Sequence, residues 1–238
     1  MKSDAIIFDK DGTLIDFDVF WVSVSVKAVE EVLEWAGDTV TSVSDVLLAF
    51  GVRDGITDIN GVLCKGTYEE LGHILYDIMK NSGCDKSCAE VTEALVRSYN
   101  KNSDAGVVKP TCENLAFVLS ELKKQNKKLA VVTTDNPEIT LKCLQKLSIC
   151  DYFDKIYTDD GKTPTKPDPY CVNDFCQSFC IERERVVMVG DTMTDMNFAK
   201  NAGIRAIGIA KSDANRQVLE SYADSVIRDP SYIFEVLN

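Results

Sequence analysis

Two carboxylates close the first apolar run of the chain. In the stretch AIIFDKDGT, Asp9 and Asp11 directly follow four apolar residues and precede Gly12 and Thr13. Two carboxylates ~4 Å apart repel by about 4 kcal/mol at an effective dielectric constant near 20. A hard divalent cation such as Mg²⁺ would offset this repulsion, because it prefers oxygen ligands. A polar Asx turn is the simpler alternative, whereas an EF-hand loop is excluded because its twelfth position would be Phe20 instead of glutamate.

Three further stretches carry polar side chains of related chemistry near the ends of apolar runs. Thr133 in VVTTDN has a hydroxyl that can bind an oxyanion, and Lys166 in TPTKPDPY is a cation between prolines that fix φ. Asp191 and Asp195 follow Gly190 in MVGDTMTDM, where Asp195 could instead favour the start of a helix. Because ligands in open α/β sheets bind beyond the carboxyl ends of the strands, the four stretches together predict one site for a phosphate group and a metal ion.

The elements that must position these residues are parallel strands. The apolar runs are mostly continuous instead of alternating, which is typical of strands buried on both faces. Helical patterns lie between them, as in 115–122 and 139–147. The sequence therefore predicts an α/β fold with a Rossmann-like parallel sheet covered by helices on both sides. The expected strands are 5–8, 129–132, 155–157, 186–189 and 206–209.

The segment 16–107 breaks the alternation of strands and helices. Its apolar residues recur at helical spacing, most clearly in 22–36 and 68–79, and no buried strand pattern is present. We therefore expect an inserted all-α domain at 16–107 and an α/β core formed by 1–15 together with 108–238.

Composition and charge exclude several classes of function. The formal net charge of −12 argues against nucleic acid or an anionic membrane as the main partner, since both require a positive surface. No apolar run reaches the ~20 residues needed to cross a bilayer, and the first residues are not typical of a secretory signal. We therefore expect a cytoplasmic protein with nine reduced cysteines whose spacing does not match a zinc site. The only histidine is His73, which argues against a Ser–His–Asp triad.

In order and spacing, the four stretches resemble the motifs of the haloacid-dehalogenase-like hydrolases, and within them those of the phosphoglycolate-phosphatase-like group with a helical cap. The matching stretches are DKDGTL from Asp9, VVTT with Thr133, KPDP from Lys166 and GDTMTD from Gly190. The resemblance covers essentially the whole chain, including the insert. It implies that 16–107 is a helical cap that acts as a lid and selects the substrate.

The resemblance implies a role for each core motif. Asp9 would be the nucleophile that attacks phosphorus and forms an aspartyl-phosphate. Thr133 and Lys166 would hold the transferring group and stabilise its charge. Asp11 would protonate the leaving oxygen and then activate water against the phospho-enzyme.

The resemblance also implies Mg²⁺ as the cofactor. A side-chain oxygen of Asp9, the backbone carbonyl of Asp11 and the side chain of Asp191 would bind the ion. Asp195 would support this set of ligands, either directly or through water.

The expected function is that of a Mg²⁺-dependent phosphatase acting on a small phosphate monoester, for which the family group suggests phosphoglycolate. Arg53 and Lys65 lie in expected loops of the insert and are candidates for contacting a second anionic group of the substrate, although loop cations are more often only solvated. The alternatives are a phosphomutase similar to β-phosphoglucomutase, which has the same core motifs, and a non-catalytic binder of a phosphorylated ligand. Nothing in the sequence indicates an oligomeric state.

Overall fold

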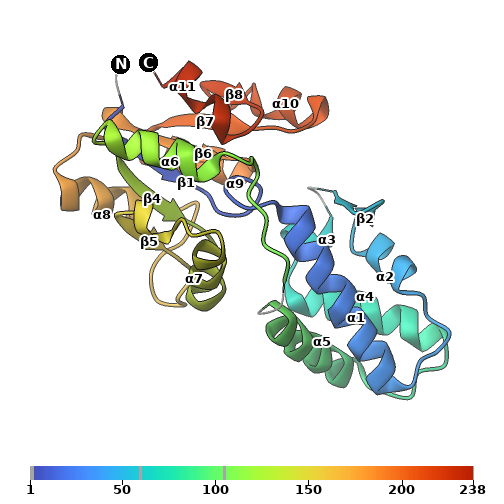
Figure 1. Cartoon of the computed structure of the whole chain (residues 1–238). Helices are drawn as coiled ribbons and strands as arrows, with labels where there is room; N and C mark the ends of the chain where they lie inside the picture. The colour runs from blue at the N-terminus through green and yellow to red at the C-terminus, as the bar shows by residue number, and fades with distance from the viewer. Residues whose placement is uncertain (1–2, 59–60, 104–105, 238) are drawn as a thin grey trace. The chain divides into compact units, whose positions relative to one another are not determined.

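The computed structural model describes residues 3–58, 61–103 and 106–237. The chain divides into two compact units (Figure 1). The first, named the core below, consists of Met1–Asp16 and Val108–Asn238. The second, named the insert, consists of Phe17–Val107.

Asp16, which the sequence analysis assigned to the insert, lies with the core. Its backbone N–H donates a 2.9 Å hydrogen bond to the carbonyl of Lys109. Its carboxylate also accepts a 2.9 Å hydrogen bond from Nζ of Lys211. Both partners belong to the core, so the chain leaves this unit only after Asp16.

The core contains a six-stranded parallel sheet in the order β5-β4-β1-β6-β7-β8 (Figure 1). This confirms the expected α/β fold with a Rossmann-like parallel sheet. β1 lies inside the sheet, between β4 and β6. The strands are β1 (Ala5–Phe8), β4 (Lys128–Val132), β5 (Lys155–Tyr157), β6 (Val186–Gly190), β7 (Arg205–Ile209) and β8 (Ser225–Ile227).

The edge strand β8 was not among the expected strands. It is three residues long, it borders only β7, and Ile227 is its one buried residue. A short strand with one neighbour buries little side-chain surface, so it leaves no continuous apolar run in the sequence.

The register of the sheet brings three strand ends to one place. All residues of β1 and β6 are buried, as expected for strands covered on both faces. Phe8 at the end of β1 pairs with Val131 of β4 on one side and with Val189 of β6 on the other. The residues that directly follow these three strands therefore meet at the same edge of the sheet.

Helices of the core pack against the sheet and fix its position. In one cluster, Phe175 of α8 and Phe198 of α9 are buried together with Ile7 of β1 and Met188 of β6. The core helices are α6 (Leu115–Lys124), α7 (Pro137–Lys146), α8 (Tyr170–Phe179), α9 (Met193–Ala202), α10 (Asp213–Leu219) and α11 (Ile233–Val236), with 3₁₀ turns η2 (Cys150–Tyr152), η3 (Arg183–Arg185) and η4 (Pro230–Tyr232).

The insert is mainly helical, and α5 packs against both α1 and α4. The buried hydroxyls of Ser25 in α1 and Tyr99 in α5 share a 2.7 Å hydrogen bond. Its helices are α1 (Ser23–Ala36), α2 (Val43–Ala49), α3 (Val62–Lys65), α4 (Tyr68–Asn81) and α5 (Cys88–Ser103), preceded by the π-helical turn η1 (Asp18–Val22). Across the described ranges of the chain, no helix has the length and apolarity that a membrane span requires.

One short hairpin corrects the expectation of an all-α insert. β2 (Val52–Arg53) and β3 (Ile56–Thr57) pair antiparallel. Asp54 and Gly55 join them with φ angles of 52° and 77°. Positive φ at both central residues is typical of a type I′ turn, for which Asp-Gly is a favoured pair. The strands are too short to produce an alternating apolar pattern, so the sequence did not reveal them.

Candidate active site

Three predicted site residues stand at neighbouring strand ends. Asp9 follows β1, Thr133 follows β4 and Asp191 follows β6. The backbone N–H of Asp9 donates to the carbonyl of Val189 at 2.8 Å, and that of Thr133 donates to the carbonyl of Tyr157 at 3.0 Å. The hydrogen bonding of the sheet thus continues into Asp9 and Thr133 and holds their backbones in place.

Lys166 reaches this edge from the connection between β5 and α8. Its Nζ lies 2.5 Å from Oδ1 of Asp9 and 2.7 Å from Oδ1 of Asp195, and all three side chains are buried. Burial lowers the pKa of Lys166, but the carboxylates of Asp195 and Asp9 raise it more, so its pKa lies above the usual value. Lys166 is therefore a fixed positive charge between two carboxylates. The peptide bond from Lys166 to Pro167 is cis.

Asp195 is held at both of its carboxylate oxygens. Oδ1 accepts a hydrogen bond from Lys166. Oδ2 accepts from the backbone N–H of Thr192 at 3.0 Å and from its hydroxyl at 2.6 Å, and the N–H of Asp195 donates to that hydroxyl in return. This is a capping box at the start of α9. The Asp195 carboxylate thus caps the start of α9, and it also lies in the acidic group beside Lys166.

Asp9, Asp191 and Asp195 each offer a carboxylate oxygen, and these atoms lie within 4.8 Å of one another. Burial raises the pKa of Asp9 to about 7, against the lowering effect of Lys166. Burial and the negative charges of Asp9 and Asp195 also raise the pKa of Asp191 well above its usual value. Lys166 therefore neutralises the group only in part. Closely spaced carboxylates that lack compensating charge fit a hard divalent cation.

Two glycines give the backbone room to approach these acids. A Cβ atom on Gly12 would lie 2.0 Å from Oδ2 of Asp191, and φ of Gly12 is +82°. A Cβ atom on Gly190 would lie 2.4 Å from Cβ of Asp195. A side chain at position 190 would therefore collide with Asp195. Thr13 completes this arrangement, because its hydroxyl donates a 3.3 Å hydrogen bond to Oδ1 of Asp191.

The hydroxyl of Thr133 is buried at the same edge. Its Oγ1 accepts a 3.2 Å hydrogen bond from the backbone N–H of Asp135. A hydroxyl that accepts a bond through its oxygen can still donate its own proton. Thr133 is thus suited to donate a hydrogen bond to a bound oxyanion.

The chain matches a known protein-family model. The family model described as haloacid dehalogenase-like hydrolase matches residues 65–209. The chain belongs to this family. The resemblance that the four motifs indicated is thereby confirmed.

Relatives within this hydrolase family carry more than one activity in their names. Pyrophosphatase PpaX of Bacillus velezensis is 26% identical over 241 residues, which cover 98% of this chain and 93% of the relative. Phosphoglycolate phosphatase of Aquifex aeolicus is 30% identical over 200 residues, which cover 84% of this chain and 81% of the relative. The crystal structure of a subfamily IA hydrolase from Geobacter sulfurreducens gives a TM-score of 0.71 at 18% identity, covering 99% of this chain and 97% of that one. The structural likeness supports the fold alone.

A buried cation that the sequence analysis did not single out lies beside the haloacid dehalogenase-like site. Lys10 is fully buried, and its Nζ lies 2.6 Å from Oδ2 of Asp11 and 3.0 Å from Oδ2 of Asp135. Burial lowers the pKa of Lys10, but the two carboxylates raise it more, so Lys10 is charged. Burial raises the pKa of Asp135 despite this partner. A signal was present, because Lys10 and Asp135 follow the adjacent strands β1 and β4 with opposite charges.

Asp11 lies close to the other motif residues, but its side chain has a different partner. Oδ2 pairs with Lys10, whereas the group that could hold a metal in the described part of the chain consists of Asp9, Asp191 and Asp195. Proton transfer by the Asp11 carboxyl and metal binding by its backbone carbonyl stay predictions.

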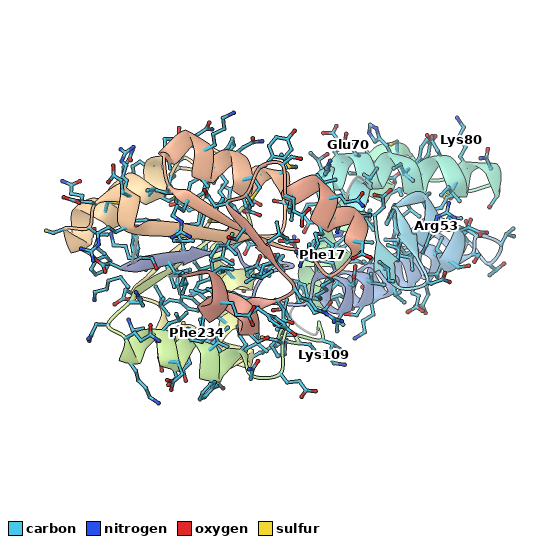
Figure 2. The ribbon with its side chains drawn as sticks, turned by 90° about the horizontal axis from the view of Figure 1, so that it is seen from above. Phe17, Arg53, Glu70, Lys80, Lys109 and Phe234 are labelled. Carbon is cyan, nitrogen blue, oxygen red and sulfur yellow. The ribbon has the colours of Figure 1, made fainter. Side chains whose placement is uncertain are left out.

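Arg53 and Lys65 belong to the insert. Arg53 is in the short hairpin and is labelled in Figure 2, and Lys65 ends α3. Both side chains are exposed. Since the insert is a unit of its own, their contacts with a substrate stay predictions.

Proposed function

We propose that this protein is a Mg²⁺-dependent phosphatase that hydrolyses a small phosphate monoester through an aspartyl-phosphate. The observation that supports this most is the group at the edge of the sheet, where Lys166 Nζ lies 2.5 Å from Oδ1 of Asp9 and the acids of the group lie within 4.8 Å of one another. In this proposal a nucleophile, a fixed cation and oxygen ligands for a metal share one site. Phosphoryl transfer depends on this combination, because its catalysis is mainly positioning and charge stabilisation.

Asp9 acts as the nucleophile in this proposal. One of its carboxylate oxygens attacks phosphorus, the bond to the leaving oxygen breaks, and the phosphoryl group stays on Asp9 until water displaces it. Lys166 supplies positive charge to the phosphoryl oxygens, and the Thr133 hydroxyl donates a hydrogen bond to them. Asp11 gives its proton to the leaving oxygen and later takes a proton from the attacking water.

Asp9, Asp191 and the backbone carbonyl of Asp11 would hold the metal. When bound there, Mg²⁺ would neutralise the charge of the carboxylates and of the phosphoryl oxygens. Asp195 supports this set by fixing Lys166 on one side and the first turn of α9 on the other. The raised pKa values of Asp9 and Asp191 favour this assignment, since both indicate charge that the protein itself does not balance.

The insert would serve as the cap that selects the substrate. Arg53 and Lys65 are its candidates for binding a second anionic group, and phosphoglycolate carries such a group in its carboxylate. The partner in this proposal is a small phosphorylated metabolite of the cytoplasm. None of the nine cysteines, all of which lie in the described ranges, forms a disulfide, and this fits a reducing compartment.

A panel of substrates tests the proposal. We expect Mg²⁺-dependent release of phosphate from at least one small monoester, phosphoglycolate first, with kcat/KM on the order of 10⁴ M⁻¹s⁻¹ or higher. Inorganic pyrophosphate belongs in the panel because of the PpaX relatives, and β-glucose 1-phosphate tests for a mutase. Faster hydrolysis of pyrophosphate than of every monoester would show that the substrate is a pyrophosphate instead of a phosphate monoester. Conversion of the sugar phosphate to its 6-phosphate without release of phosphate would indicate the mutase, and no reaction with any compound would contradict the proposal.

The metal-free protein is expected to lose stability as the pH rises from 5.5 to 7.5. Burial raises the pKa of Asp9 to about 7 and that of Asp191 above its usual value, so the folded core keeps protons that the unfolded chain has released. This stabilisation is present at pH 5.5 and is lost as the pH rises through the folded pKa. We expect the melting temperature to decrease by about 4 °C or more, since 1 kcal/mol corresponds to about 2–4 °C for a chain of this size.

Mg²⁺ should restore this stability at pH 7.5 and have less effect at pH 5.5, because it binds the ionised carboxylates. Calorimetry with and without Mg²⁺ at both pH values measures the effect. The variant Asp191→Asn should weaken both the pH dependence and the response to Mg²⁺. A response to Mg²⁺ that is equal at the two pH values, or that Asp191→Asn leaves unchanged, would speak against this metal site.

A further inference from the structure

We propose that Lys10 is a positioning residue for Asp11. It holds Oδ2 of Asp11 against Asp135 of the neighbouring loop, and so leaves Oδ1 as the oxygen that exchanges a proton with the leaving group and with water. The inference rests on the proposed phosphatase function and deepens it, because it assigns distinct tasks to the two oxygens of Asp11.

The ion pairs of Lys10 join two loops that follow adjacent strands. Asp11 follows β1 and Asp135 follows β4, and Nζ of Lys10 lies 2.6 Å and 3.0 Å from their carboxylates. The backbone of Lys10 is fixed as well, because its carbonyl accepts 2.9 Å hydrogen bonds from the N–H groups of Leu14 and Ile15. The Asp11 side chain is therefore tied to a rigid partner.

The connection continues from Asp135 to a proposed phosphate-binding residue. The backbone N–H of Asp135 donates a 3.2 Å hydrogen bond to Oγ1 of Thr133. Its carboxylate Oδ1 accepts a 3.0 Å hydrogen bond from the N–H of Asn136. Lys10 thus links the proton donor of the proposed reaction to the loop that carries Thr133.

The two oxygens of Asp11 have different surroundings. Oδ2 pairs with Lys10, whereas Oδ1 is buried and has no hydrogen-bond partner among the residues that the structure describes. A buried carboxylate oxygen without a partner is costly, and native structures keep such atoms mainly where they have a task. The task available here is the transfer of a proton between Oδ1 and the reacting oxygen.

Stability alone does not explain a buried lysine between two acids. Replacing buried ion pairs with apolar residues is often neutral or stabilising, because desolvation offsets the attraction of the charges. Lys10 orients the carboxylate of Asp11, which an apolar residue at this position would not do. A proton donor misplaced by about 1 Å can lose on the order of a hundredfold in rate.

The test uses Lys10→Met and two substrates that differ in the leaving group. An alkyl phosphate needs a proton from Asp11 when its oxygen leaves, whereas p-nitrophenolate leaves without one. We expect aspartyl-phosphate formation to slow by about 10- to 100-fold with the alkyl ester and less than about threefold with p-nitrophenyl phosphate. Hydrolysis of the phospho-enzyme should slow by about 10- to 100-fold with both. With p-nitrophenyl phosphate, acid-quenched phospho-enzyme would then accumulate and KM would fall together with kcat, whereas the Kd of the substrate should change less than about threefold.

A matched control removes a buried lysine that lies outside the candidate site. Lys127 precedes β4, at the opposite edge of the sheet, and its Nζ donates to the backbone carbonyl of Ser3. Lys127→Met should lower the melting temperature and leave kcat unchanged. The double variant Lys10→Met with Asp135→Asn neutralises one of the two carboxylates that lose their cation in the single variant. It should regain melting temperature without regaining the rate of phospho-enzyme hydrolysis.

The outcomes separate this inference from the function on which it rests. Wild-type protein that forms no phospho-enzyme from either substrate would overturn both. Wild-type protein that turns over, with a Lys10→Met variant that shows equal losses for the two leaving groups or no loss, would overturn only the role of Lys10. Recovery of the hydrolysis rate in the double variant would do the same, because it would show that Lys10 serves stability alone.

Discussion

Replacement of Asp9 with Asn is expected to lower kcat by about 10⁴-fold or more, since loss of a catalytic nucleophile removes the whole covalent route. The amide keeps the shape of the carboxyl group but is a far weaker nucleophile. The core should stay folded, because the substitution removes one of several buried negative charges. Burial raises the pKa of Asp9 to about 7, so at pH 7.5 its charge destabilises the metal-free core, and the neutral variant should melt no lower than the wild type.

A matched substitution at the other end of β1 provides the control. Asp4 immediately precedes β1, and its carboxylate pairs with Arg185 at 2.7 Å near the opposite edge of the sheet. Asp4→Asn should keep full activity and form phospho-enzyme. Phosphate release and acid-stable labelling of the protein by a phosphorylated substrate measure both variants. Turnover of Asp9→Asn within tenfold of the wild type, or labelling of another residue, would rule out Asp9 as the nucleophile.

Much of the core could be predicted because its strands are buried on both faces. Such strands leave continuous apolar runs, and the runs at β1, β4 and β6 locate the strand ends where Asp9, Thr133 and Asp191 stand. The rule that ligands bind beyond the carboxyl ends of parallel strands then assigns these residues to one edge. Their presence at this edge is a feature of the fold, whereas their roles in catalysis stay predictions.

Other features leave weaker signals in the sequence. The edge strand β8 and the hairpin of β2 and β3 are short and partly exposed, so neither produces a run or an alternation. Lys166 lies in the connection between β5 and α8, where no periodicity indicates which side chain turns inward. The motif around Lys166 predicted that this residue belongs to the site, whereas its 2.5 Å contact with Asp9 is seen only in the structure.

The link between Lys10 and Asp135 was missed for a different reason. Both residues are polar and adjacent to motif residues, so each one alone is compatible with a solvated loop. Their burial depends on contact between two loops, and such contact leaves no trace in the local pattern of one chain. Opposite charges at the ends of adjacent strands are the one sequence signal that would have predicted this ion pair.

Replacement of Lys166 with Met is expected to lower kcat by about 10²- to 10³-fold, because it removes a fixed charge from the phosphoryl group in the transition state. It also leaves the buried carboxylates of Asp9 and Asp195 without the cation that lies 2.5 Å and 2.7 Å away from them. Breaking a buried pair in this way costs about 3–5 kcal/mol. Lys166→Arg should not restore the rate, since the larger planar guanidinium does not fit a site built around one ammonium group.

The loss of stability in Lys166→Met should depend on pH, and its sign follows from Asp9. The pKa of Asp9 is about 7 with Lys166 present, so at pH 5.5 Asp9 is mainly protonated and loses little when the cation is removed. At pH 7.5 Asp9 is ionised and loses a partner, so the variant should be destabilised more at pH 7.5 than at pH 5.5. Adding Asp195→Asn should recover part of this stability and none of the activity. Equal destabilisation at both pH values would contradict the pairing of Lys166 with an ionised Asp9. Activity that returns together with stability would show that Lys166 supports the fold without acting on the phosphoryl group.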